Sequence, residues 1–466
     1  MSDSCRRVLR RARAEMSFNP RPSPWPSPSQ GEGERYPLDT CRFIHAADLH
    51  IDSPFKGLRD VDERVAARLQ SATYEAFRNL VRLCIEERVA FLLIAGDVYD
   101  AEDRGVRAQV RFREGLAELA ARGIETFVVH GNHDPLDGWQ SALSWPKGVH
   151  IFGPQPEWKL AGASRVAGYG SGTPTAAIQG VSYPTREVTE NLAQRFSPPQ
   201  DPSLFSIGLL HCNVGGNPDH PNYAPCTAEE LAQVGLDYWA LGHVHTRQTL
   251  RDARRSGPPT IHYPGNTQGR HPNESGPRGC TLVEVGAGRS VRLEFKPLDV
   301  VRWETAGVSI TGVKTLDGLV GAVRQAMDDL SAKAEGRDVV CRLRVTGRGP
   351  MHAELRRSGA LDELLATVRT DAGAASPWVW AERISDETRP DLDLNARSRQ
   401  DDFLGAVLRH GAYAVSDPAG AAHLSGLLSE VYSGRRGGLE TPSPAQVEAW
   451  AEEARWRLAE LLQPEE

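Results

Sequence analysis

The sequence lacks any apolar run long enough to cross a membrane. Its longest runs, such as residues 89–95, fall far short of the roughly 20 apolar residues that a transmembrane helix needs. A basic stretch at residues 6–13 is not followed by an apolar segment, which argues against a secretory signal. These absences predict a cytoplasmic protein with no membrane partner.

A Cys-x-x-Cys pair is also missing. The seven cysteines are scattered over 466 residues, and their number is odd. This pattern argues against a disulfide framework and a structural zinc ribbon, and it fits a reducing compartment. Cys212 stands beside His211 and could bind a metal with it. Since neighbouring residues on a strand point to opposite faces, a buried thiol is the favoured interpretation.

The chain has no excess of basic residues. Its formal net charge is −7 and its pI is near 6.1. Because a protein that only binds nucleic acid is usually basic, this balance weighs against generic DNA binding. It does not exclude a nuclease, since local basic patches can contact DNA and an acidic metal cluster lowers the net charge.

The length predicts two or three domains. Residues 1–39 are rich in Pro and Ser without periodicity, which predicts a disordered tail. A transit peptide and a start site placed too early are alternatives for this segment. We expect a phosphoesterase domain at residues 40–300, a small α+β cap-like domain at 301–395, and a helical segment at 396–466.

Strand and helix patterns alternate after residue 40. Apolar runs predict strands at residues 42–46, 89–95, 124–129, 205–210 and 238–241. Helical periodicity at residues 61–87 and 106–121 predicts helices between the first three strands. Strands separated by helices favour an α/β fold with right-handed crossovers and a largely parallel central sheet.

Polar motifs follow five of the predicted strands. Their polar residues are, in chain order, Asp48 and His50; Asp97 and Asp100; Asn132, His133 and Asp134; His211; and His243 and His245. Ligands of open α/β sheets collect at the carboxyl ends of strands, so these side chains are expected to converge in one crevice. Each motif alone is weak, because a single His is more often structural than a ligand. The whole set in this order is hard to obtain by chance.

The residue types in these motifs suit metal ions. Carboxylate, imidazole and amide donors without thiolate fit manganese, iron or zinc. Seven ligands are too many for one such ion but suffice for two, if one carboxylate is shared. Two ions roughly 3.5–4 Å apart can hold a phosphate and activate a hydroxide for in-line attack.

The ordered motifs D-x-H, GD, GNHD, H and GHxH resemble the signature of the calcineurin-like metallophosphoesterase superfamily. Within it, FIHAADLHIDSPFKGL and HYPGNTQGRHPNESGPRGC are similar to the bacterial YhaO group. That group is related to SbcD, the nuclease subunit of the SbcC–SbcD complex. The resemblance implies a DNA exonuclease of DNA repair that uses two divalent ions, with manganese the expected metal.

The resemblance also implies roles for single residues. One ion would be held by Asp48, His50, Asp97 and His245, and the other by Asp97, Asn132, His211 and His243. His133 would act as general acid or stabilise charge in the transition state.

Asp100 departs from the SbcD-like pattern, which commonly has a histidine there. Phosphoprotein phosphatases of the superfamily have an aspartate paired with the histidine of their GNH motif. Asp100 is therefore expected to orient His133 and raise its pKa. The alternative is an Asp that only caps the segment before the next helix.

Two further sets of residues are candidates for substrate contacts. The segment 263–279 contains Arg270, His271 and Asn273, which could contact substrate phosphates, or it is an ordinary surface loop. Two arginine clusters could contact DNA, although such runs are more often solvated faces. They are Arg104, Arg107, Arg111 and Arg113, and Arg247, Arg251, Arg254 and Arg255.

Three functional classes remain open from the sequence. The first is the DNA nuclease, and the second is a phosphodiesterase or phosphatase acting on a small molecule or phosphoprotein. The third, a binding subunit without turnover, is disfavoured because every expected ligand and His133 are present. SbcD-like proteins dimerise and bind a coiled-coil ATPase through C-terminal helices. The amphipathic residues 449–462 could serve that ATPase contact or pack on their own domain.

Overall fold

The structure is a computed structural model, and it describes residues 41–53, 55, 63–100, 105–138, 144–162, 173–216, 221–370, 376–416, 418–433 and 442–462. The expected tail at residues 1–39 lies outside this set. The described chain divides into two compact units. The first unit extends to Trp303 and includes Ser331–Val339, and the second comprises Glu304–Leu330 and the residues from Val340 onward. The four-segment division expected from the sequence stays a prediction.

The first unit contains two six-stranded sheets. One has the order β12-β11-β1-β2-β3-β4. Its strands are β1 Cys41–Ala46, β2 Phe91–Ala95, β3 Glu125–Val129, β4 Val149–Ile151, β11 Gly279–Val285 and β12 Val291–Pro297. β1 to β4 pair in parallel, and β11 and β12 add antiparallel strands at one edge.

The second sheet has the order β5-β6-β7-β8-β10-β9. Its strands are β5 Glu157–Ala161, β6 Ala176–Val181, β7 Phe205–His211, β8 Tyr238–Gly242, β9 Gln248–Arg251 and β10 Thr260–Tyr263. The expected α/β class with helices flanking central sheets is confirmed. The expectation of a single, largely parallel sheet is wrong, because β7 and β8 pair with β6 and β10 and not with β1 to β3.

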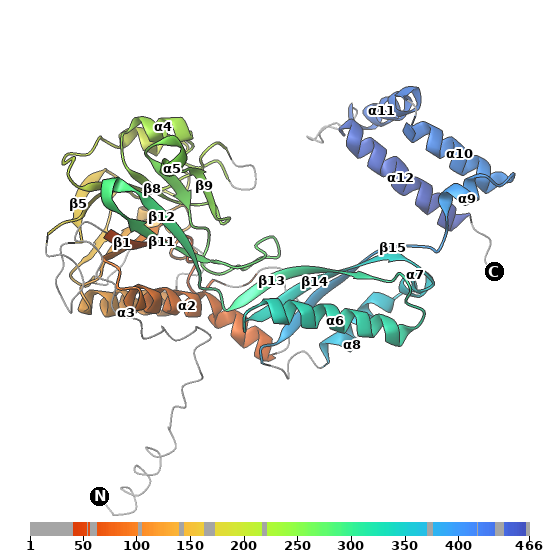
Figure 1. The fold of residues 1–466 in the computed structure, drawn as a ribbon, viewed down its shortest axis with the longest axis horizontal. Helices are drawn as coiled ribbons and strands as arrows, with labels where there is room; N and C mark the ends of the chain where they lie inside the picture. Colours follow the sequence, from red (N-terminus) through yellow and green to blue (C-terminus); the bar gives the residue numbers. More distant parts are fainter. Residues whose placement is uncertain are drawn as a thin grey trace, which may run out of the picture. The chain divides into compact units, whose positions relative to one another are not determined.

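The central strands β1, β2 and β3 of the first sheet are buried on both faces, which explains their continuous apolar runs. One face packs under α2 (Glu63–Glu86) and α3 (Val106–Ala121), which lie side by side (Figure 1). The other face meets the second sheet, with Phe43 and Phe91 stacked there at a ring-centroid distance of 4.9 Å. The outer face of the second sheet is covered by α4 (Ala228–Gln233) and the 3₁₀ helix η4 (Leu192–Arg195). The unit is therefore a helix–sheet–sheet–helix sandwich.

Shorter helices complete the first unit. They are the 3₁₀ helices η2 (Leu136–Gly138) and η5 (Ala287–Arg289) and the single turn α5 (Ala253–Ser256).

The second unit begins with a three-stranded sheet of order β13-β14-β15. Its strands are β13 Val301–Ser309, β14 Asp338–Arg348 and β15 Val379–Arg389, and its helices are α6 Leu316–Lys333, α7 Met351–Leu355 and α8 Ala360–Arg369. Buried apolar side chains of α6 recur at helical spacing, from Leu319 to Val323 and Leu330. This is the small α+β arrangement that the sequence predicts after residue 300.

The chain continues into a group of helices, α9 Leu394–Ser398, α10 Phe403–Ser416, α11 Pro418–Ser433 and α12 Pro444–Leu461. α10 lies beside α12 (Figure 1), and Leu404 and Leu408 of α10 pack with Trp456 of α12. Among the helices in the described part of the chain, none is both long and apolar enough to span a membrane.

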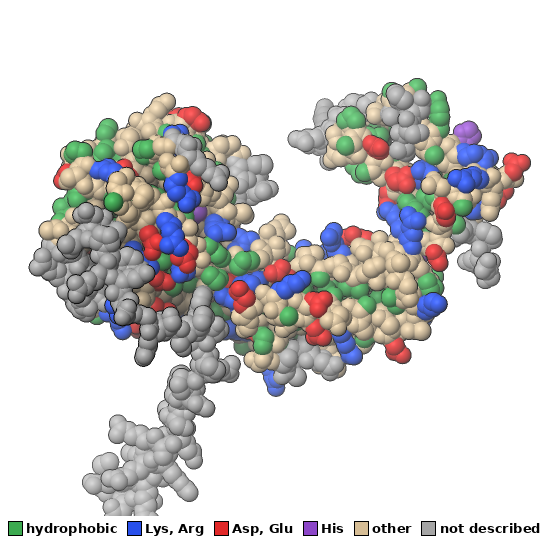
Figure 2. Space-filling model, viewed as in Figure 1, with side chains coloured by type: hydrophobic (Ala, Val, Ile, Leu, Met, Phe, Trp, Pro, Cys, Tyr) green, Lys and Arg blue, Asp and Glu red, His purple; other side chains and the backbone are tan. Residues whose placement is uncertain are grey.

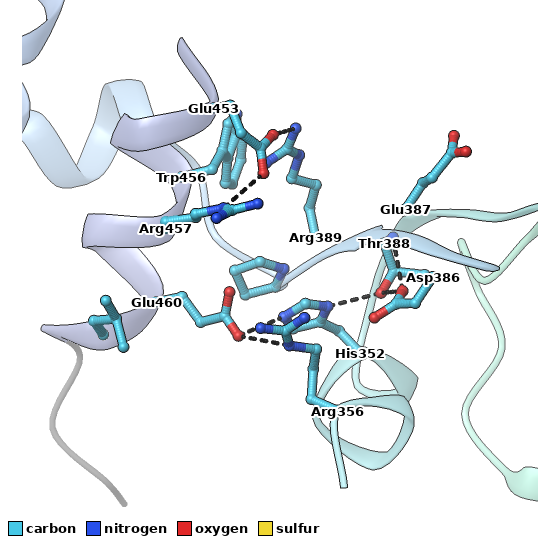
Figure 3. A pocket seen from close by; sticks show the side chains of 12 residues that line it. His352, Arg356, Asp386, Glu387, Thr388, Arg389, Glu453, Trp456, Arg457 and Glu460 are labelled. Carbon is cyan, nitrogen blue, oxygen red and sulfur yellow. Dashed lines mark hydrogen bonds and ion pairs between the residues drawn. The ribbon is translucent and has the colours of Figure 1, made fainter. Parts of the chain in front are cut away.

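Figure 3 shows how α12 meets β15 and α7. The Trp456 ring, 7% exposed, contacts two guanidinium groups, with Arg348 4.4 Å and Arg389 5.3 Å from the ring centroid. Glu460 Oε1 lies 3.3 Å from His352 Nε2. One aromatic side chain and several ion pairs therefore hold α12 in place.

Candidate active site

Tight loops after the strands carry the candidate ligands. Asp48 and His50 follow β1, Asp97 follows β2, and the 130–134 turn follows β3. The first two loops bond to each other, since Asp48 N donates to Gly96 O at 3.1 Å and His50 N donates to Asp97 O at 3.0 Å. Positive φ angles occur at Asp48 (52°), His50 (44°) and Asp97 (52°). Such backbone strain is common where a site must hold side chains in fixed places.

Glycines let these loops approach closely. A Cβ on Gly242 would lie 1.7 Å from Ala95 O, and a Cβ on Gly131 would lie 2.3 Å from Asp97 Oδ1. Both positions exclude every larger residue unless the site moves. In the sequence, a glycine stands directly before most of the ligand motifs.

Three of the predicted ligands form one group around His50. Its Nε2 lies 3.4 Å from His245 Nε2 and 4.0 Å from Asp97 Oδ2. His245 Nε2 is 3.9 Å from Asp48 Oδ1. Donor atoms of Asp48, His50 and His245 all lie within 4.8 Å of one another. This spacing fits the ligands of one metal ion.

The other predicted ligands form a second group around Asn132. Its Oδ1 lies 3.0 Å from His211 Nε2 and 3.2 Å from His243 Nδ1. Asp97 Oδ2 lies 3.4 Å from the same His211 nitrogen. Because Asp97 Oδ2 also approaches His50, this carboxylate stands between the two groups.

Each of the four histidines has one ring nitrogen directed into the ligand cluster. The other ring nitrogen donates a hydrogen bond to an acceptor outside that cluster. His211 Nδ1 donates to Ala95 O at 2.9 Å, and His243 Nε2 donates to Pro221 O at 2.8 Å. His50 Nδ1 donates to Asp100 at 2.7 Å, and His245 Nδ1 donates to a carboxylate at 2.5 Å. This arrangement fixes the tautomer and leaves the other nitrogen with a lone pair, as in metal-bound histidines.

The electrostatics of the site favour a bound cation. Burial raises the pKa of Asp97 to about 7, and burial together with the nearby Asp97 charge raises the pKa of Asp48 well above its usual range. Burial also lowers the pKa of His211 to about 3, so that imidazole is neutral. Divalent ions at this position would stabilise the ionised form of the two buried carboxylates and bind the neutral imidazole of His211. The carboxylate, imidazole and amide groups of this site therefore fit two divalent metal ions.

His133 and Asp100 lie beside the first group. Asp100 Oδ1 is 2.8 Å from His133 Nδ1, and Asp100 Oδ2 accepts from Arg270 Nη1 at 2.8 Å. Although burial lowers the pKa of His133, the hydrogen bond to Asp100 and the charge of Asp97 outweigh it and raise this pKa. Burial raises the pKa of Asp100, but its bonds to His133 and His50 hold it far below the usual range. The expected pairing is present in the geometry, and its role in catalysis stays a prediction.

Two acidic residues at the site have no role in the sequence-based interpretation, Asp134 of the HGNHD motif and Glu274. Asp134 accepts from the backbone N–H groups of Val98 at 2.9 Å and Gly131 at 2.8 Å, so it ties two ligand loops together. Glu274 is the carboxylate that accepts from His245 Nδ1. Burial raises the pKa of Glu274, but the bonds from His245 and the Arg270 backbone hold it well below the usual range. The motif HGNHD points to Asp134, whereas nothing in the sequence marks Glu274.

The three residues predicted to contact substrate differ in their exposure to solvent. Arg270 is buried against Asp100, whereas His271 and Asn273 are exposed. Of the arginine clusters, Arg107 and Arg111 both form ion pairs with Asp52, at 3.0 and 2.9 Å. These two arginines hold α3 to the loop after β1, which weakens their candidacy as DNA contacts.

Other members of the arginine clusters also have protein contacts. Arg247 lies over the Phe295 ring at 4.4 Å, and Arg254 pairs with Asp252 at 2.8 Å. Arg104 lies outside the described residues.

Cys212 lies in an apolar cluster, as the buried-thiol interpretation predicts. It is fully buried, and its Sγ is 3.8 Å from Cys226 Sγ. Burial raises the pKa of the Cys212 thiol well above its usual range, so it remains protonated.

Comparison with known proteins decides the family. Residues 41–247 match the calcineurin-like phosphoesterase family, and residues 303–389 match the middle domain of metallophosphoesterase YhaO. The uncharacterized metallophosphoesterase YhaO of Bacillus subtilis is 36% identical over 366 residues, which cover 78% of this chain and 85% of that protein. The chain belongs to the YhaO family of calcineurin-like metallophosphoesterases. The resemblance expected from the motifs is confirmed, and the protein is a metal-binding phosphoester hydrolase.

A nuclease subunit and a DNA double-strand break repair protein are more distant relatives of this YhaO family member. The SbcD subunit of the nuclease SbcCD from Bacillus subtilis is 26% identical over 313 residues, covering 60% of this chain and 73% of that protein. A DNA double-strand break repair protein Mre11 of Thermoplasma acidophilum is 23% identical over 332 residues, covering 69% and 81%.

Proposed function

We propose that this YhaO family member is a two-metal phosphodiesterase whose substrate is DNA, acting as an exonuclease in DNA repair. Asp48, His50, Asp97 and His245 would hold one ion, and Asp97, Asn132, His211 and His243 would hold the other. Manganese is the proposed metal, with iron and zinc as alternatives, because the donors are carboxylate, imidazole and amide groups.

One observation carries the proposal. Each of the four histidines directs one nitrogen into the cluster of Asp48, Asp97 and Asn132 while an outer acceptor holds its other nitrogen. A set of merely structural histidines would not need this shared orientation. The arrangement is that of ligands prepared for cations.

The protein would contribute binding, orientation and proton transfer. When bound, the two ions supply Lewis acidity toward the phosphate and lower the pKa of water. His133 is 32% exposed in its side chain, so it can meet a substrate, and Asp100 holds it through Nδ1. The other ring nitrogen, Nε2, would then protonate the leaving oxygen or stabilise its charge.

DNA as substrate is supported by the relatives and by one arginine. The relatives include proteins named as a nuclease subunit and as DNA double-strand break repair proteins. Within the described residues, the buried Nε of Arg270 has no hydrogen-bond partner, although its Nη1 binds Asp100. A phosphate oxygen of the substrate would satisfy this N–H. His271 and Asn273 are proposed to contact DNA nearby, where their exposure makes them accessible.

A phosphatase or phosphodiesterase acting on a small molecule or phosphoprotein is the second candidate. The Asp100–His133 pair favours it, because the phosphoprotein phosphatases of the superfamily have an aspartate at this position. On the face drawn in Figure 2, basic and acidic side chains are interspersed and do not form one basic stripe. The net charge of −7 is consistent with that surface.

The test is cleavage of linear double-stranded and single-stranded DNA, alongside bis(p-nitrophenyl) phosphate, with added manganese. Asp97→Asn and His133→Asn variants serve as site controls. DNA degradation by the parent but not by the variants supports the nuclease. Cleavage of bis(p-nitrophenyl) phosphate alone would favour the second candidate. If neither DNA nor bis(p-nitrophenyl) phosphate is cleaved, the proposal of a phosphodiesterase is contradicted for both kinds of substrate.

An interaction partner is proposed on the helical segment. Most of the large apolar side chains that are exposed in the described residues lie on or directly after α10–α12, including Phe403 (73%), Tyr413 (60%) and Leu461 (78%). Exposed apolar groups mark an interaction site where they form one contiguous patch. An SbcC-like coiled-coil ATPase is the proposed partner. A homodimer through the phosphoesterase domain is also proposed, on the resemblance to SbcD alone.

A cytoplasmic location is part of the same proposal. The six cysteines among the described residues are all free thiols, which suits a reducing compartment.

A further inference from the structure

A loop between β10 and β11 folds back on the histidine turn of the site. Asn266 N donates to His245 O at 3.2 Å, and Gly279 N donates to Asn266 O at 3.1 Å, which closes the loop. Arg278 Nη1 also donates to His245 O, at 2.6 Å. Gly265 has φ +80°, and a Cβ there would lie 2.7 Å from His245 O. The loop, residues 265–279, is therefore fixed against His245.

The carboxylate of Glu274 connects this loop to the candidate ligands. Its Oε1 accepts from His245 Nδ1 at 2.5 Å, and its Oε2 accepts from the backbone N–H of Arg270 at 2.6 Å. The Glu274 side chain is only 14% exposed. Arg270 in turn binds Asp100, and Asp100 accepts from His50 Nδ1. Both histidines of the first group are thus oriented by carboxylates that the loop supplies or holds.

The histidines of the second group donate to acceptors that lie outside the loop. His211 and His243 are oriented by the backbone carbonyls of Ala95 and Pro221. Neither of these acceptors belongs to residues 265–279. The two candidate metal sites therefore differ in what fixes their histidines.

We propose that Glu274 is a positioning residue that selectively governs the metal ion held by His50 and His245. It fixes His245 with its proton on Nδ1, so that the Nε2 lone pair faces the ion. It also holds the Arg270 backbone, and through Arg270 it supports Asp100 and His50. The second ion, held at His211 and His243, is independent of Glu274. This inference rests on the proposed two-metal function.

The experiment is manganese binding by the full chain, measured by isothermal titration calorimetry, with no substrate present. The parent is expected to bind two ions. In Glu274→Ala, one ion is expected to bind about 10- to 100-fold more weakly, as when other outer partners of metal-bound histidines are removed. The other ion is expected to keep its parental affinity. Glu274→Gln should lose less, because its amide oxygen can still accept from Nδ1–H.

Glu229→Ala is the matched control, since Glu229 is an exposed glutamate on α4. It is expected to bind both ions as the parent does. Circular dichroism melts of all variants separate a loss of metal from a loss of folding. If Glu274→Ala does not fold, the nearly isosteric Glu274→Gln variant decides the proposal. Its single amide oxygen cannot accept from both His245 Nδ1 and Arg270 N, so one ion should bind more weakly, and parental affinity at both sites would then overturn the proposal.

Three results would overturn the proposal. Parental affinity at both sites in Glu274→Ala would show that the hydrogen bond does not position His245. Equal weakening at both sites would remove the selectivity. A parent chain that binds no manganese, iron or zinc would contradict the proposed function itself, and this inference with it.

Discussion

Replacing Gly131 by alanine should damage the metal site without destroying the fold. The new Cβ would lie 2.3 Å from Asp97 Oδ1 and 2.8 Å from two ring atoms of His211. Neither side chain is free to move away. Asp97 Oδ1 accepts from His133 N at 2.9 Å, and the His211 ring is held by Ala95 O. The strain therefore falls on two proposed ligands.

The size of the effect follows from the cost of overpacking. One extra methyl group in a packed interior costs about 1–3 kcal/mol. If the metal-bound arrangement bears that strain, manganese affinity falls about 5- to 150-fold. Gly153→Ala is the control, because a Cβ there meets no atom within 4 Å. It should change stability by less than about 0.5 kcal/mol.

The assay pairs manganese titration with thermal unfolding of the metal-free chain. Gly131→Ala should unfold cooperatively and bind manganese weakly, while Gly153→Ala should match the parent in both measurements. Parental manganese affinity in Gly131→Ala would contradict this prediction. It would show that manganese binding does not require Asp97 and His211 to stay where they lie.

Three more predictions concern other parts of the chain. Asp100→Asn should lower the pKa of His133, so the fall of activity at alkaline pH should begin at lower pH than in the parent; an unchanged pH–rate profile would contradict the pairing. Trp456→Ala should destabilise the docking of α12 by about 3–5 kcal/mol, and limited proteolysis should then release α12. Trp450→Ala, 46% exposed on the same helix, should resemble the parent. At Glu87, burial raises the pKa, but ion pairs with a lysine and an arginine outweigh it and lower the pKa. The ionised Glu87 therefore contributes stability above its unfolded pKa, near 4.3, and that contribution is lost as pH falls through the lower folded pKa. Glu87→Gln should cost about 0.5–1 kcal/mol in urea unfolding at pH 7 and nothing in acid; an equal cost at both pH values would contradict the ion pairs.

The positions of the metal-site residues could be predicted because local signals determine them. Helix α3 spans the predicted residues, and β2, β7 and β8 match the apolar runs within two residues. Asp97 and His211 stand at the carboxyl ends of β2 and β7, which belong to different sheets. Within each sheet, parallel pairing brings residues that follow neighbouring strands to one edge.

The separation into two sheets could not be predicted from those signals. β7 and β8 have the same apolar pattern as β2 and β3, so nothing local tells which strands pair. Partner choice depends on contacts between distant residues, such as Phe43 against Phe205 between the sheets. The sequence of β6, AAIQGV, gives no clear strand signal, because its apolar run is short and contains small residues.

The hydrogen-bond acceptors of the four histidines could not be predicted from the sequence either. Any carboxylate or backbone carbonyl can accept from an imidazole N–H, so sequence spacing does not identify Glu274, Ala95 or Pro221. Arg270 was expected to contact substrate, whereas the structure also pairs it with Asp100. Only the folded structure of the loop reveals the contact of Glu274 with His245 and that of Arg270 with Asp100.

The most direct test of the two-metal site is the structure of a crystal grown with manganese, with data collected for anomalous scattering. A two-metal site should give two peaks roughly 3.5–4 Å apart. Asp97 should lie between them, with His50 and His245 at one peak and His211 and His243 at the other. A single peak, or two peaks that do not share Asp97, would contradict the two-metal site.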